Sequence, residues 1–206
     1  MNRIDDLFGE PIRRDHEALG PGAALLHGFA LTEARAVLDA VDVITTAAPL
    51  RHLITPGGFR MSVAITNCGR LGWISDHRGY RYSALDPETG QPWPAMPDAL
   101  LTLAQSAAVE AGYAHFTPDA CLINRYVPGA RMTLHQDRNE KDFSHPIVSV
   151  SLGLPVVFQL EVAHLPVALP QLRHRTLHES LTTLAAAMVA TAKAATKQRS
   201  MLFKTT

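Results

Sequence analysis

The chain has 206 residues, enough to bury one ordinary domain core, and 47% of them are hydrophobic, which excludes a disordered protein. Its 19 lysines and arginines balance its 19 aspartates and glutamates, so the molecule as a whole does not attract nucleic acid or membranes, and any polyanion must bind to a local patch. The two cysteines exclude a disulfide framework and fit a reducing cytoplasm.

The start of the chain predicts no packed element. Residues 1–20 are polar and charged, which predicts a loose lead-in, and they contain no apolar stretch of the kind found in a signal peptide. No window of the chain reaches about 18 consecutive apolar residues, so the sequence predicts no membrane span.

Two helices are predicted in the first half of the chain. After a short predicted strand within residues 22–31, apolar residues recur at helical spacing between Thr32, a plausible N-cap, and Pro49, which stops the pattern. A second helix is predicted before residue 113, where Asp98 can cap its start and Gly112 can end it.

Strands are predicted in the middle of the chain, where apolar and polar residues alternate. The alternation covers residues 61–66, 120–126 and 146–153, each next to a turn or a proline. In the last of these, Val148 and Val150 face one way and Ser149 the other. Early helices followed by clustered strands predict an α+β fold.

Residues 69–97 have a different composition. They carry four glycines, four prolines, two tryptophans and two tyrosines. Turn-forming residues in that number predict an extended loop with exposed rings, which is often a binding surface.

The character of the sequence changes again after Gln159. From 154 to 206 there is no further tryptophan or tyrosine, and the run "LHESLTTLAAAMVATAKAATKQRS" predicts one helix over about 177–198. The remainder of a sheet domain should resemble residues 120–160. The sequence therefore predicts a domain that is incomplete at its C-terminal end.

One short motif carries metal-binding chemistry. Within "TLHQDRNEKDF", His135 and Asp137 are two residues apart and share one face of a strand. An imidazole and a carboxylate are two of the three ligands of the facial triad that binds Fe(II). The alternative is a solvated strand end with an incidental ion pair.

Four stretches together resemble the AlkB family of Fe(II)- and 2-oxoglutarate-dependent dioxygenases, in order from about residue 20 to 159. They are "TPGGFRMSVAITNCGRLGW", "GYRYSALDPETGQPWPAMP", "DACLINRYVPGARMTLHQD" and "PIVSVSLGLPVVFQL". The resemblance implies a double-stranded β-helix, or jelly roll, with flanking N-terminal helices. It also implies Fe(II) as cofactor with 2-oxoglutarate and O₂ as co-substrates, and oxidative demethylation of alkylated bases in single- or double-stranded DNA, or in RNA. We expect a cytoplasmic monomer.

The resemblance also assigns residues to the cofactors. It implies that His135 and Asp137 are iron ligands with a catalytic role, and it places Asn124, Arg125 and Tyr126 at the 2-oxoglutarate site. Asn124 and Tyr126 share a strand face, so one ligand can contact both. The alternative for these two is a hydrogen-bonded strand face lining a barrel.

Further residues match the lid that grips the damaged nucleotide. Trp73 and Tyr80 match most closely, and an extruded base is held by stacking of this kind. The alternative is that both rings pack locally on the barrel. The other residues that the resemblance assigns to substrate binding are Thr55, Met61, Arg81, Tyr82 and Asn139.

The sequence departs from the family in two places. Asn139 stands where a close bacterial member has an aspartate facing the target base; a neutral amide attracts a cationic methylated base less strongly. The third iron ligand and the arginines that bind 2-oxoglutarate have no counterpart after Gln159, where His164, His174 and His178 lie in unmatched contexts. A change of reading frame near codon 160 would give such a tail.

These observations divide the chain into a lead-in (1–20), a dioxygenase core (21–159) with a nucleotide-recognition flap (about 55–97), and an alanine-rich tail (160–206). They leave three functional hypotheses. The first is an active nucleic-acid demethylase, and the second is an inactive nucleic-acid-binding remnant of the same family. The third is a small-molecule oxygenase or metal-binding jelly roll, which the aromatic flap disfavours.

Overall fold

The computed structural model describes residues 15–20, 22–132, 135–136, 145–153, 158–162, 175–177, 184–191, 194–197 and 201–204. In these ranges the chain forms two helices, α1 (Ala34–Ala47) and α2 (Asp98–Glu110), and thirteen strands. The strands are β1 (His16–Gly20), β2 (Ala23–Leu26), β3 (Ala64–Gly69), β4 (Gly72–Asp76), β5 (Gly79–Ser83), β6 (Ala120–Arg125), β7 (His135–Gln136), β8 (Pro146–Gly153), β9 (Phe158–Val162), β10 (Arg175–Leu177), β11 (Leu184–Thr191), β12 (Ala194–Lys197) and β13 (Met201–Lys204).

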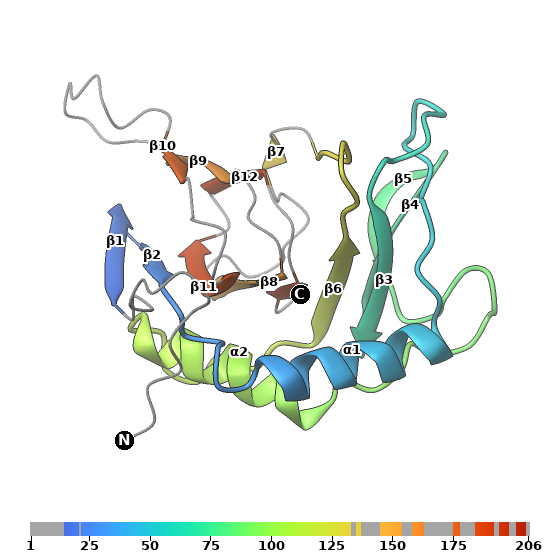
Figure 1. The fold of residues 1–206 in the computed structure, drawn as a ribbon. Helices are drawn as coiled ribbons and strands as arrows, with labels where there is room; N and C mark the ends of the chain where they lie inside the picture. Colours follow the sequence, from blue (N-terminus) through green and yellow to red (C-terminus); the bar gives the residue numbers. More distant parts are fainter. Residues whose placement is uncertain are drawn as a thin grey trace.

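Two sheets and two helices form the layers of the molecule. The larger sheet has seven strands in the order β1-β2-β11-β8-β13-β6-β3, and the smaller has four in the order β10-β9-β12-β7. Figure 1 shows the smaller sheet across from the larger one, with α1 and α2 along the outer side of the larger sheet. The two-stranded hairpin β4-β5 stands beside β3. None of the described helices is long and apolar enough to cross a lipid bilayer.

Both predicted helices form, with different ends from those expected. The N-cap of α1 is Glu33 and makes no side-chain cap hydrogen bond, so the assignment of Thr32 as N-cap was wrong. The N-cap of α2 is Pro97, so the assignment of Asp98 as the cap was wrong too. Asp98 is instead the first helical residue, near the positive end of the helix dipole. Gly112 follows its C-terminus with φ +87°, a conformation that favours glycine, as predicted.

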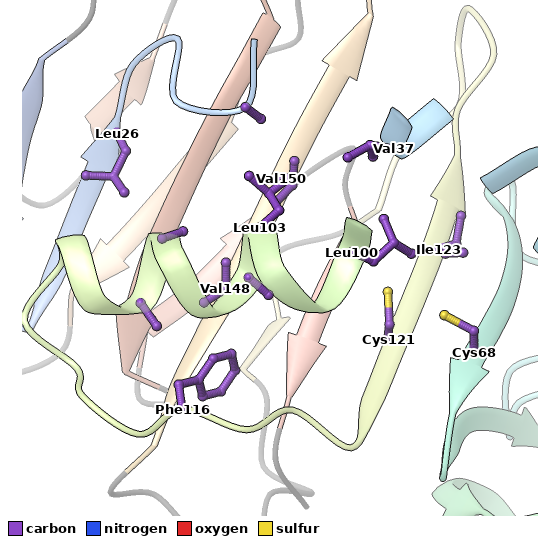
Figure 2. Packing of buried hydrophobic residues seen from close by; sticks show 14 of the residues in the cluster. Leu26, Val37, Cys68, Leu100, Leu103, Phe116, Cys121, Ile123, Val148 and Val150 are labelled. Carbon is purple, nitrogen blue, oxygen red and sulfur yellow. The ribbon is translucent and has the colours of Figure 1, made fainter. Parts of the chain in front are cut away.

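Strand β6 separates two apolar cores because its side chains alternate. Cys121 and Ile123 face the helices, where they pack in a cluster with residues such as Leu100 of α2 and Val148 of β8 (Figure 2). Leu122 faces the opposite way and packs with Ile65 and Val63 in a second, smaller cluster. The period-2 pattern predicted for this segment is therefore confirmed.

Strand β8 follows the same rule with a polar inner side. Val148 and Val150 lie in the core beneath the helices, as predicted, while Ser149 and Ser151 are buried on the other face. A face that buries hydroxyl groups between two sheets suits a polar ligand better than a purely apolar core does.

The tail is not the predicted helix. Its described segments form β10, β11, β12 and β13. Strand β11 pairs antiparallel with β2 on one side and β8 on the other, and β13 pairs with both β6 and β8. Alanine favours helices by less than 1 kcal/mol per residue over most other residues, so backbone pairing on both sides overrides that preference. The larger sheet is continuous through these strands.

The predicted lead-in also contains a strand. Residues 16–20 form β1, which pairs antiparallel with β2 at the edge of the larger sheet. Its polar residues are compatible with a strand because an edge position leaves one side in water. Residues 1–14 lie outside the described part of the chain.

The position of β11 can be tested with an engineered disulfide. Ala24 of β2 and Val189 of β11 are direct cross-strand partners, so their Cα atoms are within the span that a disulfide bridges. We expect the Ala24→Cys/Val189→Cys variant to form this bond under mild oxidation, detected by peptide mass mapping. The matched control replaces Leu184, opposite Gly153 and about 17 Å further along the strand. Equal cross-linking in both variants would contradict the register.

Candidate active site

The hairpin β4-β5 carries the aromatic residues predicted for the lid. Trp73 and Tyr80 stack with ring centroids 5.4 Å apart and an interplanar angle of 12°. Trp73 is half-buried and lies opposite Tyr82 in the register, whereas Tyr80 leaves 45% of its surface exposed. The predicted extended loop is therefore a paired hairpin here, and it presents a stacked pair of rings with one ring open to solvent.

The other face of the hairpin is held by an ion pair. Both guanidinium Nη atoms of Arg81 donate to the carboxylate of Asp76, at 2.8 and 2.7 Å. This hydrogen bond, together with one from the Arg78 backbone N–H, holds the pKa of Asp76 well below its ordinary range. Arg81 thus stiffens the lid from the side opposite Ser75 and Trp73. Its predicted substrate contact stays a prediction.

Asn67 anchors the hairpin to the larger sheet. Its side-chain amide donates to the Trp73 carbonyl at 3.0 Å, and its Oδ1 accepts from the Trp73 N–H at 2.9 Å. Asn67 is 2% exposed, so both bonds are shielded from water. Two such bonds together contribute about 1–3 kcal/mol to the free energy of unfolding. They fix the backbone of Trp73, whose ring stacks on Tyr80.

Further hydrogen bonds attach the hairpin to the segments on either side of it. The Ser75 hydroxyl donates to the Ile54 carbonyl at 2.7 Å, and the Trp93 indole N–H donates to the Ser83 carbonyl at 3.0 Å. Trp93 is 7% exposed, so only part of the predicted aromatic surface is available to a ligand.

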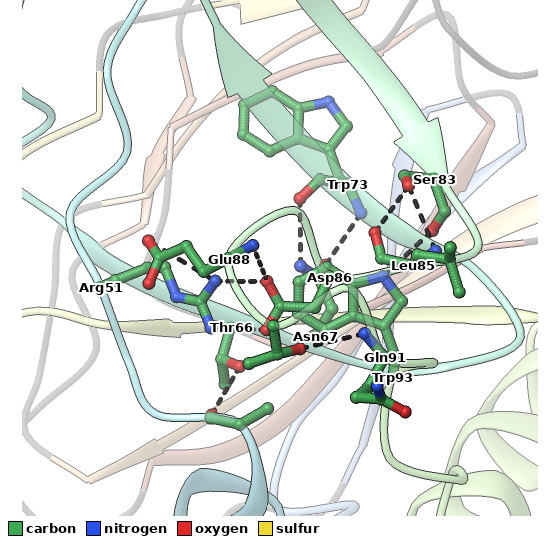
Figure 3. A network of polar contacts seen from close by, with 12 residues as sticks. Arg51, Thr66, Asn67, Trp73, Ser83, Leu85, Asp86, Glu88, Gln91 and Trp93 are labelled. Carbon is green, nitrogen blue, oxygen red and sulfur yellow. Dashed lines mark hydrogen bonds and ion pairs between the residues drawn. The ribbon is translucent and has the colours of Figure 1, made fainter.

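A buried ion pair supports this arrangement from beneath (Figure 3). Arg51 donates both Nη atoms to Asp86, at 2.5 and 2.7 Å, and its guanidinium carbon lies 6.0 Å from the Trp93 ring centroid. The hydrogen bond from Arg51 lowers the pKa of Asp86 despite its burial, which acts in the opposite direction. The two residues are 35 positions apart in the chain, so the pair joins both flanks of the hairpin.

A cavity of about 210 Å³ lies between the hairpin and these supports. The residues that line it include Arg51, His52, Asn67, Trp73, Ser75 and Trp93. His52 is held by a 2.8 Å contact between its Nδ1 and the Met61 carbonyl. The base of the hairpin is therefore attached by hydrogen bonds and also borders this cavity.

Three of the predicted site residues meet at one apolar cluster. Met61, Trp73 and Tyr126 are half-buried and pack against Val63 and Ile65 on the inner side of the sheet. The structure thus brings the lid together with the strand predicted to hold 2-oxoglutarate. The local-packing alternative for Trp73 is also true in part, because its ring belongs to this cluster.

The predicted 2-oxoglutarate residues divide between two faces. Asn124 lies opposite Ile65 on the inner face, and its buried Oδ1 has no hydrogen-bond partner among the described residues. A buried amide with an unused hydrogen-bonding position costs free energy unless a ligand or water meets it, so Asn124 fits a polar co-substrate. The Tyr126 hydroxyl is buried too. Arg125 is exposed and alternates onto the other face, so the structure does not bring it to them.

The structure places only part of the predicted metal motif. His135 lies in β7, the edge strand of the smaller sheet, opposite Thr196 of β12. Asp137 and Asn139 lie outside the described residues, as do His164, His174 and His178. A histidine and a carboxylate suit Fe(II) as a donor set. In the described ranges, no group of three or more histidine, cysteine, aspartate or glutamate side chains forms a metal site.

Thr55 belongs to the lid's surroundings rather than to the aromatic stack. Its hydroxyl accepts from the Phe59 N–H at 3.1 Å within a turn next to the hairpin. The sequence did not identify Arg51, Asn67 or Ser75 as lid supports. Asn67 carried a signal, because an asparagine in a predicted strand needs a partner when it is buried. Arg51 carried none, since its partner is remote in the chain.

Known proteins resemble this chain in sequence and in fold. Residues 22–200 match the 2OG-Fe(II) oxygenase superfamily. The chain is 54% identical over 143 residues to the alpha-ketoglutarate-dependent dioxygenase AlkB of Salmonella typhimurium and 53% identical to that of Escherichia coli. Each match covers 69% of this chain and 66% of the relative, so the chain spans just under two thirds of their length.

The solved structure of OsALKBH1 is similar in fold, with a TM-score of 0.72 at 15% identity over 93% of this chain and 100% of that chain. Similarity at that identity shows the fold alone. It confirms the predicted jelly roll with mixed helices and strands.

The Arg51–Asp86 pair gives a pH-dependent prediction. Because the pKa of Asp86 is lower in the folded chain than the ordinary value near 4 of the unfolded chain, the pair stabilises fully above about pH 4 and loses its contribution as the pH falls below that value. Arg51→Ala leaves a buried carboxylate unpaired, and we expect it to lower the free energy of unfolding by about 3–5 kcal/mol at pH 7. Urea unfolding at pH 7 and pH 3 measures this.

The difference between the unmodified protein and Arg51→Ala should shrink at pH 3, where Asp86 is increasingly protonated. Arg35→Ala, which removes an exposed i,i+4 pair with Asp39, is the control and should change the free energy of unfolding by less than about 1 kcal/mol. A pH-independent loss in Arg51→Ala would refute the ion-pair account.

Asn67→Ala tests the anchoring of the lid. Removing the amide leaves the Trp73 N–H and carbonyl without their partner, so we expect faster amide hydrogen exchange in β4 and β5 and a loss of about 1–3 kcal/mol in stability. Exchange in β6 and β8 should rise less. Thr45→Ala, which removes an exposed hydroxyl on α1, should leave exchange in the hairpin unchanged.

Proposed function

Because the chain belongs to the 2OG-Fe(II) oxygenase superfamily, we propose that it is an Fe(II)- and 2-oxoglutarate-dependent dioxygenase that oxidatively removes methyl groups from alkylated bases in nucleic acid, and thereby repairs alkylation damage. The predicted family is thus confirmed, and so are the predicted cofactors at the level of the family, whose name specifies them. The demethylation, its nucleic-acid substrate and the cytoplasmic location are proposals for this chain.

The observation that carries the proposal is the common cluster of Met61, Trp73 and Tyr126. It places a lid with stacked aromatic rings directly against the strand that bears Asn124. An enzyme that acts on a base must take it out of the stack and hold it by its faces. The exposed ring of Tyr80, stacked on Trp73, offers such a face next to the proposed co-substrate site.

The residues of the chain would divide the work as follows. Iron and 2-oxoglutarate, when bound with O₂, supply the oxidising chemistry at the methyl group, with His135 and Asp137 as iron ligands. The amide of Asn124 would hydrogen-bond 2-oxoglutarate on the inner face, with Tyr126 beside it. Trp73 and Met61 would keep water from the reacting base, because their side chains close the apolar cluster next to that face.

Asn139 would shape substrate preference rather than the chemistry. A neutral amide in place of a carboxylate still accepts a hydrogen bond, but it lacks the Coulomb attraction for a cationic methylated base. We therefore propose a weaker preference for cationic over neutral lesions than an aspartate would give.

Metal loading and turnover test this function together. Under anaerobic conditions, Fe(II) and 2-oxoglutarate should give a visible charge-transfer band, and admission of air with a methylated oligonucleotide should release succinate and formaldehyde. His135→Ala and Asp137→Ala should abolish the band and reduce succinate release to the level without enzyme. His115→Ala, at an exposed position outside the proposed site, is the control and should retain both.

Different failures point to different conclusions. If the unmodified protein gives neither the band nor succinate but still binds the oligonucleotide, it is the non-catalytic binding protein. If it releases succinate with small organic molecules and never with nucleic acid, the demethylase proposal is overturned in favour of a small-molecule oxygenase.

A further inference from the structure

A second aromatic side chain projects beside the lid. Phe59 leaves 76% of its surface exposed, more than any other large apolar side chain among the described residues. It ends the Pro-Gly-Gly turn that begins after Thr55. Leaving a phenyl ring in water has a cost that burial against a partner recovers.

Hydrogen bonds close the turn and fix the backbone from which this ring projects. The Thr55 N–H donates to the Phe59 carbonyl at 2.8 Å, the Phe59 N–H donates to Thr55 Oγ1, and the Gly58 N–H donates to the Thr55 carbonyl at 2.9 Å. Gly58 has φ +82°, which a side chain disfavours, and a Cβ on Gly57 would lie 3.4 Å from the Phe59 ring. The ring therefore lies next to Gly57 on a turn whose backbone is already closed, so less backbone entropy is lost when the ring binds a partner.

The turn and the lid form one unit. The Ser75 hydroxyl of β4 donates to the carbonyl of Ile54, which begins the turn and pairs with Arg60 at its other side. Figure 1 shows this turn and the β4-β5 turn projecting at the same end of the molecule, the end at which β6 terminates. The turn that carries Phe59 and the turn that leads into Tyr80 therefore project from the same end of the molecule.

The unit is also positively charged in a neutral chain. Residues 55–83 contain four arginines and one aspartate and no lysine or glutamate, a net charge of +3, whereas the whole chain has a net charge of zero. Arg70 pairs with Asp119 outside this stretch and Arg81 pairs with Asp76, so Arg60 and Arg78, exposed next to the two turns, carry the remaining positive charge. An exposed aromatic ring flanked by free-standing positive charge matches a partner with flat apolar faces and a polyanionic backbone.

We propose that Phe59 stacks on the base next to the extruded nucleotide, on the same strand, while Arg60 and Arg78 lie near the phosphates on its two sides. This inference rests on the proposed function, because it describes how that site binds the nucleotides next to the extruded base. Stacking of successive bases on successive rings is tolerant of sequence, so Phe59 contributes affinity without choosing a base.

A fluorescent base reports this contact without turnover. The probe is a short single-stranded oligonucleotide with a methylated base and 2-aminopurine beside it. The unmodified protein should quench the 2-aminopurine on binding. Phe59→Ala should bind roughly 5- to 150-fold more weakly, the range of one base stacked on an aromatic side chain, and should not quench the bound probe. Phe59→Trp keeps an aromatic ring at this position and should quench the probe as the unmodified protein does.

Turnover with altered substrates gives a second readout. Phe59→Ala should raise KM for the methylated oligonucleotide and leave kcat nearly unchanged, because the ring does not touch the reacting base. On an oligonucleotide with abasic sites on both sides of the methylated base, Phe59→Ala and the unmodified protein should have equal KM. Val43→Ala, another exposed apolar truncation (69% exposed) on α1, should match the unmodified protein throughout.

The two proposals fail in different ways. Quenching by the unmodified protein without succinate release supports the contact of Phe59 and contradicts the demethylase function. Normal demethylation with equal binding and quenching by Phe59→Ala overturns the role of Phe59 alone. A change in oligomeric state in Phe59→Ala with unchanged oligonucleotide binding assigns the ring to a contact between copies of the chain instead, and also overturns the proposal.

Discussion

The pairing of β3 with β6 is the constraint on which the site depends. Because side chains alternate across a strand, the register that opposes Ile65 to Asn124 also opposes Cys68 to Cys121 on the other face. A slip of β6 by one residue would turn Asn124 toward the helices and the Cys121 thiol toward the smaller sheet. The helix-side core therefore fixes which polar groups face the site. Burial, together with the neighbouring Cys68, raises the pKa of the Cys121 thiol, so that thiol stays neutral in this core.

The position of the lid depends on the same pairing, through Asn67 of β3. Asn67 occupies the inner face two residues from Ile65, and from there it holds the Trp73 backbone. The Arg51–Asp86 pair joins the segments before and after the hairpin, and a cavity lies beneath the hairpin. The hairpin is therefore attached at its base by hydrogen bonds and borders a cavity.

The sequence predicted what local periodicity and family resemblance encode: the two helices, the alternation of β6 and β8, and the aromatic pair. It failed where pairing partners are remote. Residues 184–191 were predicted as helix from their alanines, but backbone bonds to β2 and β8 decide their state. For the same reason no pattern joined Arg51 to Asp86. Within the site, the inner positions of Asn124 and Tyr126 followed from the two-residue period of a strand. Arg125 was assigned to the same 2-oxoglutarate site, but it lies between them and is exposed on the opposite face.

The segment before the Phe59 turn has a consequence for solubility. β3 is the last strand of the larger sheet, and its outer edge would offer unpaired backbone groups to another chain. Arg51 occupies that edge, since its N–H and carbonyl exchange hydrogen bonds with Ile65 at 2.9 and 2.8 Å. The segment around Arg51 therefore also hinders the addition of a strand from another molecule. Substitutions that detach this segment to admit a bulkier substrate would favour aggregation before they abolished folding.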